Sequence, residues 1–523
     1  MLKILSVCSL LVCTSLLVWW FRSGESLLDN MEGVVDADAE IEAEAEKANG
    51  DKNKPEEEKV EKVSDDLNKP SEVKNIEDEK NKKKELETKK SNTEVNKSED
   101  QVDDAVTKTS LDGFNVAVKD LTINGKNVRV SPFAGVGVVT VNFCFKHAGK
   151  KMSPKQKEAL VDLLSKSLGE STESKNNDQV EAYKREKNIH IGFSGVDDHF
   201  FISAKCPSTK LIELFALVND LLFHAEFKEP DIERFKEELF AALMQSMQSP
   251  ESQLNELIKE TVYKNHPYGT PNKIYLESLK NITAVDLKKF VKNMFTQENL
   301  IVSVCGDFDE KSLSEQLEIF IDTLPKKFKA ELPKNISVEG PYETYSTKFP
   351  VPQTVLKFLH KGIDHDHPDF FALQVAVGCL SDPFVGLLFK KLRVEKALVY
   401  GIGAGLAIQD HFNAFGVSTF TQTENVEKVI ASVKEVFEDV CKNGFSPELV
   451  ENIKMGFVGS YKRSFASSGH IARRLANYQL TDRPVNYHKV LIEKTEALTP
   501  EQVSEAFKKF LNPNQFIIFT VGQ

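Results

Sequence analysis

The chain has 523 residues, of which 41% are hydrophobic and 35 are phenylalanine, and its formal net charge at pH 7 is −12. This length predicts about two to four domains and allows substantial hydrophobic cores. The negative charge argues against nucleic acid as a principal partner.

The chain begins with an apolar, uncharged run at residues 4–21, which is long enough for a membrane span of about 17–25 residues. Trp19 and Trp20, the only tryptophans, stand at its end, where an interfacial aromatic belt would lie. No small-x-small cleavage site follows. We expect residues 1–28 to be a retained signal-anchor, with a cleaved signal peptide as the alternative. The flanking charges place the body on the non-cytoplasmic side, which is the periplasm if the source is bacterial.

Residues 29–110 consist mainly of Glu, Lys, Asp, Asn and Ser, with almost no aromatic side chains. Such a segment cannot bury enough apolar surface to offset its ordering entropy. We therefore expect a disordered, charged tether between the membrane and the globular body.

The globular body contains an internal repeat, because residues 279–307 align without gaps with residues 495–523. Thr283 matches Thr499 as a helix N-cap, and an amphipathic helix, a turn and an apolar strand follow each of them. The offset is far longer than a solenoid period. It indicates a duplicated domain, and we expect homologous domains at residues 111–335 and 345–523.

Further helices and strands recur in both halves. Amphipathic helices are predicted at residues 210–223 and 426–440, Pro-started helices at 230–243 and 447–460, and strands at 141–146 and 354–358. The strands follow one another as hairpin-like neighbours rather than in strict βαβ alternation. The sequence therefore predicts an α+β fold in which each half is a mostly antiparallel sheet covered by helices.

Two hydrogen-bond donors with long reach, Arg393 and Tyr400, stand where a predicted helix passes into an extended segment. Arginine stays charged at any relevant pH, and two such donors can hold a carbonyl oxygen or an oxyanion that forms from it. The structural alternative is that Arg393 pairs with Glu395 or caps the helix, while Tyr400 packs in a sheet.

Four stretches of the body are distinctive: His367-Pro368-Asp369, residues 392–400 (LRVEKALVY), residues 444–448 (GFSPE) and the closing unit at residues 499–522. In these stretches the body resembles the insulinase/pitrilysin-type zinc metallopeptidases, which include the mitochondrial processing peptidase and bacterial two-subunit relatives. One departure is the loop at residues 379–383, where the family often has a Gly/Ser-rich turn.

Active members of this family carry an H-x-x-E-H zinc motif on the first helix of the first half. The matching helix, expected at residues 154–169, contains no histidine and has Val-Asp-Leu-Leu-Ser at residues 161–165. Glu237 and Glu238, on the helix that would supply the third ligand, indicate a solvated helix face. The only close histidine pair, His365 and His367, indicates an exposed turn, and the remaining histidines are scattered. We therefore expect no metal and no catalytic residues of its own in this chain.

The resemblance implies a zinc-less companion subunit of a heterodimeric metallopeptidase. Arg393 and Tyr400 would bind peptide or unfolded protein in the active site of a homologous zinc-bearing subunit, and this chain alone would be inactive. The alternative is a non-catalytic scaffold or binding protein at the membrane. A third interpretation, an enzyme with a relocated metal, is disfavoured by the scattered histidines.

Overall fold

The computed structural model describes residues 116–523, which belong to one compact unit. The predicted anchor at residues 1–28 and the predicted tether at residues 29–110 lie outside the described residues. Within residues 116–523, none of the helices combines the length and the apolar character that a membrane crossing requires.

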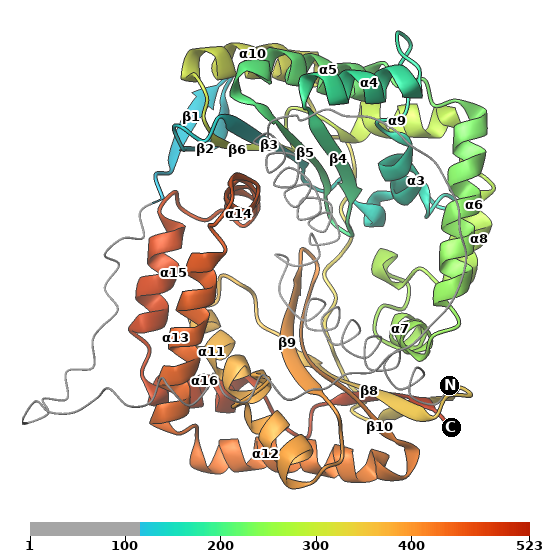
Figure 1. Ribbon diagram of the computed structural model, residues 1–523. Coiled ribbons are helices and arrows are strands. Elements are labelled where there is room, and N and C mark those ends of the chain that lie inside the picture. The colour runs from blue at the N-terminus through green and yellow to red at the C-terminus, as the bar shows by residue number, and fades with distance from the viewer. Residues whose placement is uncertain (1–115) are drawn as a thin grey trace, which may run out of the picture. The chain divides into compact units, whose positions relative to one another are not determined.

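The first sheet has six strands in the order β1-β2-β6-β3-β5-β4, and all neighbours except β2 and β6 are antiparallel (Figure 1). Apolar and β-branched residues dominate its central strands, as expected for a sheet covered on both faces. Its strands are β1 (Lys119–Ile123), β2 (Lys126–Pro132), β3 (Val138–Phe145), β4 (His190–Gly195), β5 (Phe200–Pro207) and β6 (Leu300–Gly306).

The second sheet has five strands in the order β7-β11-β8-β10-β9. It repeats the pairing of the first sheet, since β7 and β11 are parallel and the other neighbours are antiparallel. The predicted α+β fold with two mostly antiparallel sheets is confirmed. The strands are β7 (Thr344–Lys348), β8 (Gln353–Lys361), β9 (Ile402–Gln409), β10 (Phe412–Gln422) and β11 (Ile517–Gly522).

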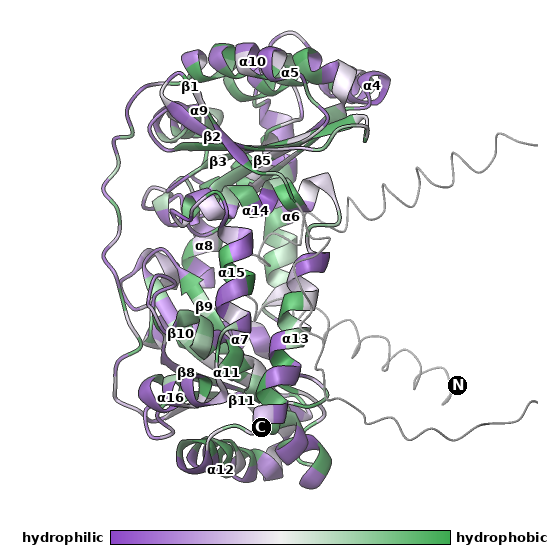
Figure 2. Cartoon of the chain, turned by 90° about the vertical axis from the view of Figure 1, so that its left-hand side faces the viewer, coloured by the Kyte–Doolittle hydropathy of each residue, from purple (hydrophilic) through white to green (hydrophobic). Residues whose placement is uncertain are grey.

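Helices cover both sheets, and hydrophilic and hydrophobic residues alternate along them (Figure 2). The helices of the first half are α3 (Leu160–Ser167), α4 (Asn177–Lys187), α5 (Leu211–Phe223), α6 (Glu229–Ser246), α7 (Pro250–Thr261), α8 (Asn272–Leu279), α9 (Ala284–Met294) and α10 (Glu310–Thr323). Those of the second half are α11 (Phe370–Ser381), α12 (Val426–Asn443), α13 (Pro447–Arg463), α14 (Ser468–Leu480), α15 (Tyr487–Glu496) and α16 (Pro500–Phe510).

Thr283 and Thr499 form capping boxes at the starts of α9 and α16, as their spacing predicts. The predicted helix at residues 154–169 is shorter than expected, because α3 begins only at Leu160. Gln156 adopts a φ of 67°, which is incompatible with a right-handed helix at that position. The apolar stripe of α3 is buried, as predicted.

Each half lends one helix to the sheet of the other half (Figure 1). Helix α14 of the second half packs on β6, β3 and β2, where Ser303 Oγ donates to the carbonyl oxygen of Ala472 at 2.6 Å. Helix α7 of the first half packs on β11 and β8, where Leu254 and Ile258 join the core beneath the second sheet. The two halves are therefore interdependent in packing.

Candidate functional site

Arg393 and Tyr400 lie side by side at the entrance to β9. Arg393 belongs to η5 (Phe389–Glu395), a π-helix, and Tyr400 stands two residues before β9 begins. The Arg393 Nη1 atom donates to the carbonyl oxygen of Tyr400 at 2.8 Å, and the guanidinium carbon lies 4.1 Å from the centroid of the tyrosine ring. The Tyr400 side chain is 46% exposed. The structure thus brings together the two residues that the sequence singled out.

The structure contradicts two parts of the structural alternative, the Arg393–Glu395 pair and the packing of Tyr400 in a sheet, whereas Arg393 does lie in the last turn of η5. Glu395 pairs with Lys391 at 3.6 Å, and Lys391 also pairs with Glu435. Among the described residues, Arg393 has no carboxylate partner, and Tyr400 is exposed outside the sheet. The remaining N–H groups of Arg393 and the Tyr400 hydroxyl therefore stay available to an outside acceptor.

The position of the family's zinc motif is filled by packing. On α3, the Ser165 hydroxyl donates to the carbonyl oxygen of Val161 at 2.8 Å and accepts from the Gly195 N–H of β4 at 2.9 Å. A Cβ atom on Gly195 would lie only 2.1 Å from Val161 Cγ1. Valine offers no ligand atom, and β4 lies directly against the helix. The side chains at this place therefore do not fit a zinc ion.

The carboxylates of Glu237 and Glu238 form a solvated helix face, as the sequence indicated. Both are exposed on α6. Glu238 pairs with Arg234 at 3.1 Å and with Lys166 at 3.3 Å. These contacts are ordinary surface ion pairs.

The segment around His365 and His367 is the predicted exposed turn. His367 Nδ1 accepts the backbone N–H of Asp369 at 3.0 Å, just before α11 begins. His365 lies between Asp364 and Asp366, with ring nitrogens 2.7 and 3.7 Å from their carboxylates. The three side chains could surround a cation, but the two carboxylates are exposed.

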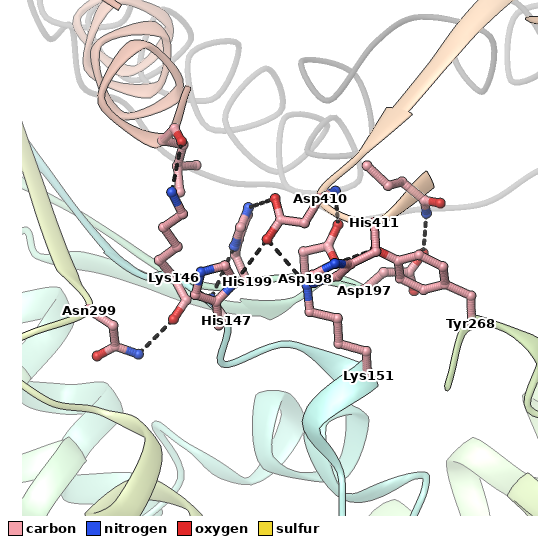
Figure 3. A network of polar contacts seen from close by, with 12 residues as sticks. Lys146, His147, Lys151, Asp197, Asp198, His199, Tyr268, Asn299, Asp410 and His411 are labelled. Carbon is pink, nitrogen blue, oxygen red and sulfur yellow. Dashed lines mark hydrogen bonds and ion pairs between the residues drawn. The ribbon is translucent and has the colours of Figure 1, made fainter. Parts of the chain in front are cut away.

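The β4–β5 hairpin of the first half meets the β9–β10 hairpin of the second half, at a place that the sequence did not indicate (Figure 3). The turn between β4 and β5 contacts the turn between β9 and β10. Gln409 Nε2 donates to Asp197 Oδ2 at 2.9 Å, and the Asp410 N–H donates to Asp198 Oδ2 at 3.1 Å.

Asp410 is the centre of this cluster. Its carboxylate lies 3.0 Å from His147 Nδ1, 3.5 Å from His199 Nε2 and 3.2 Å from Lys151 Nζ. Lys151 is fully buried and also pairs with Asp198. The histidines that looked scattered in the sequence are thus grouped by the fold. No spacing signal could have found them, because they come from turns that lie far apart along the chain.

The protonation states follow from burial and charge. Burial lowers the pKa of His199 to about 4, against the opposing charges of Asp410 and Asp198. Burial alone would raise the pKa of Asp410, but the hydrogen bond from His147 and the charges of His199 and Lys151 lower it well below its ordinary value. At neutral pH, Asp410 is therefore a carboxylate and His199 is neutral.

A cavity of about 450 Å³ lies beside α3. It is lined by Lys150, Lys151 and Glu158, which precede α3, and by residues of α6, α7 and α8. Asp162 lines it and accepts from Tyr275 Oη at 2.9 Å and from Lys150 Nζ at 2.8 Å. Burial and the charge of Asp162 raise the pKa of Tyr275 well above its ordinary value, so the phenol remains a donor.

Residues 281–457 match the family described as "Peptidase M16 inactive domain". The chain is 20% identical over 392 residues to the "Non-peptidase homolog YmxG" of Helicobacter pylori. The alignment covers 73% of this chain and 88% of that protein. It is 20% identical over 208 residues to the mitochondrial-processing peptidase subunit beta of Neurospora crassa, covering 39% of this chain and 42% of that protein.

The fold is shared with the crystal structure of a peptidase M16 inactive domain from Pseudomonas fluorescens. That structure superposes with a TM-score of 0.70 and 22% identity, and it covers 77% of this chain and 98% of its own. Residues 281–457 therefore match the inactive domain of the peptidase M16 family, and residues 116–523 have the fold of the Pseudomonas fluorescens structure.

Proposed function

We propose that this protein is a catalytically incomplete companion subunit of a zinc metallopeptidase. Arg393 and Tyr400 act on the substrate of a homologous, zinc-bearing partner, while zinc and the general base come from that partner. The substrate is a peptide or an unfolded protein segment.

The observation that carries this proposal is that the Arg393–Tyr400 pair has hydrogen-bond donors without an acceptor in residues 116–523. The neighbouring lysines and glutamates neutralise one another, whereas within residues 116–523 the Arg393 guanidinium has no ion pair and interacts with Tyr400. Stacking on the guanidinium orients the phenol at little entropic cost. An oriented cation and an oriented phenol at the surface can donate hydrogen bonds to an oxygen atom of another molecule.

The same segment has the surface character of a contact region. Phe384 is 84% exposed and Val394, next to Arg393, is 66% exposed. Large apolar side chains on an exposed segment favour contact with another protein. The similar Neurospora protein is by its name one subunit of a peptidase, which supports a paired assembly.

In the assembly, Arg393 holds a backbone carbonyl of the substrate as a fixed charge. The Tyr400 hydroxyl donates to the scissile carbonyl oxygen, and this bond strengthens as negative charge develops there. The partner supplies the activated water. This chain contributes positioning and charge stabilisation only.

A second candidate function is a non-catalytic scaffold or binding protein. It is favoured by the similarity to a protein named a non-peptidase homolog and by the cavity beside α3. In this case the Arg393–Tyr400 pair would have no effect on any cleavage.

The test is a cleavage assay on the untagged protein, alone and mixed with a zinc-bearing relative from the same genome, with an unfolded polypeptide as substrate. We expect cleavage only in the mixture, and a decrease of at least about 10-fold with Arg393→Ala. Arg234→Ala is the matched control, because Arg234 also stacks on a neighbouring ring, that of Phe235 at 4.0 Å. Equal rates for both variants would favour the scaffold.

A further inference from the structure

The cluster where the halves meet contains the chemistry of a metal site, on residues other than those of the family's zinc motif. His147, which follows β3, comes from the first half, and Asp410 and His411, between β9 and β10, come from the second. One ring nitrogen of each histidine and one carboxylate oxygen of Asp410 all lie within 4.8 Å of one another. Figure 3 shows Asp410 with His147, His199 and Lys151 around it.

The buried side chain of His411 independently indicates a ligand at this place. It is only 9% exposed, and its Nε2 atom is buried without a hydrogen-bond partner among the described residues. Its Nδ1 atom lies 2.8 Å from Asn335 Oδ1, so Nδ1 bears the proton and Nε2 the lone pair. An orphaned, buried lone pair is unfavourable unless something binds it. An outer amide that fixes the tautomer is typical of metal-ligating histidines.

The surrounding groups orient the other ligands. His199 Nδ1 accepts the backbone N–H of His147 at 3.3 Å, so its Nε2–H faces Asp410 Oδ1 at 3.5 Å. Lys151 brings a positive charge close to Asp410, but Asp198 pairs with the same ammonium. With neutral imidazoles, the charges of Lys151, Asp198 and Asp410 leave the cluster net negative before a cation enters.

We propose that His147 Nδ1, the Asp410 carboxylate and His411 Nε2 bind one divalent transition-metal ion of the Zn²⁺ type. Two imidazoles and one carboxylate form a ligand set that suits Zn²⁺. His147 Nδ1, which lies 3.0 Å from an Asp410 carboxylate oxygen, binds the metal in its deprotonated form. The ion links the first half to the second. This proposal departs from the sequence expectation of a metal-free chain, and it does not depend on the companion-subunit function.

The test uses the full chain without a histidine tag, stripped by a chelator and titrated with ZnCl₂. We expect one zinc ion per chain by elemental analysis after desalting, and a rise in the melting temperature with zinc. Co²⁺ in place of Zn²⁺ gives a visible spectrum without a thiolate charge-transfer band. Loss of an outer-shell partner alone weakens metal sites by about 10–100-fold, so His411→Ala should weaken binding by at least about 100-fold.

Two further variants keep the test decisive. His147→Gln removes a ligand from a different element and should give the same loss, which guards against misfolding of the His411 variant. His365→Ala removes the exposed Asp364–His365–Asp366 group and should leave zinc binding unchanged. The proposal is overturned if wild type binds no zinc, or if binding depends on His365 rather than on His147 and His411.

Discussion

Arg393 stacks on the ring of Tyr400 and donates to the carbonyl oxygen of the same residue, so the two side chains form one unit at the entrance to β9. The unit is exposed, and its two side chains have no hydrogen bond or ion pair to any other part of residues 116–523. Such a unit contributes little to folding. Its exposure is explained if it contacts something outside this chain.

Arg393→Ala is expected to change the free energy of unfolding by no more than about 1 kcal/mol, because it removes an exposed cation–π contact and one surface hydrogen bond. Tyr400→Phe should change it by less, since the Tyr400 hydroxyl has no partner within residues 116–523. Urea unfolding followed by circular dichroism measures both. A loss above about 3 kcal/mol for either variant would assign the pair to the fold rather than to function.

The exchange of α7 and α14 between the halves predicts a single unfolding transition. Ile258, which is 8% exposed on α7, packs in the core beneath the second sheet. Ile258→Ala should cost about 2–5 kcal/mol and lower the stability of both halves together. Calorimetry is the measurement, and Ile274→Ala on α8, where Ile274 is 44% exposed, is the control. Two separate transitions, of which only one shifts, would contradict this interdependence.

Strand β4 can lie against α3 because Gly195 has no side chain at the point where it faces Val161. Gly195→Ala should destabilise the protein by about 1–3 kcal/mol, because the new methyl group overlaps Val161 Cγ1. In a double-mutant cycle, Val161→Ala should recover part of this loss. The control is Gly456→Ala on α13, where the added Cβ meets nothing within 4 Å and stabilisation of up to about 1 kcal/mol is expected. An additive cycle would show that the two residues do not touch.

Acid sensitivity is predicted for the Asp120–Arg129 pair, which also reaches the second half through a 2.8 Å bond from Arg129 Nη1 to the carbonyl oxygen of Arg483. Burial alone would raise the pKa of Asp120, but hydrogen bonds from Arg129 and Asn127 lower it below its ordinary value of 3.8. A lowered folded-state pKa gives stability that is present above the unfolded pKa and is lost as the pH falls through the folded value.

Asp120→Asn should therefore cost about 1–3 kcal/mol near neutral pH, and the difference from wild type should shrink below about pH 4. Unfolding in urea at a series of pH values measures this. Glu237→Gln, at an exposed carboxylate, is the control and should show little difference at any pH. A difference for Asp120→Asn that stays constant down to acid pH would contradict the assignment.

The sequence predicted much of the fold but little of the way in which the halves combine. The aligned segments that start at Thr283 and Thr499 revealed the duplication, because caps and periodicity are local signals. The Arg393–Tyr400 pair was found for the same reason, since its members are seven positions apart. Nothing local indicates that α14 covers the first sheet, or that His147 meets Asp410, because both contacts form only when distant elements assemble.

The most direct measurement for the companion-subunit function is the steady-state kinetics of Tyr400→Phe in the mixture with the zinc-bearing partner. A donor that acts on developing charge predicts a kcat lower by about 100-fold or more, with a nearly unchanged KM. The folded state of the variant is checked by its melting temperature. An unchanged kcat in a folded, partner-bound Tyr400→Phe variant would contradict the proposed role of this chain.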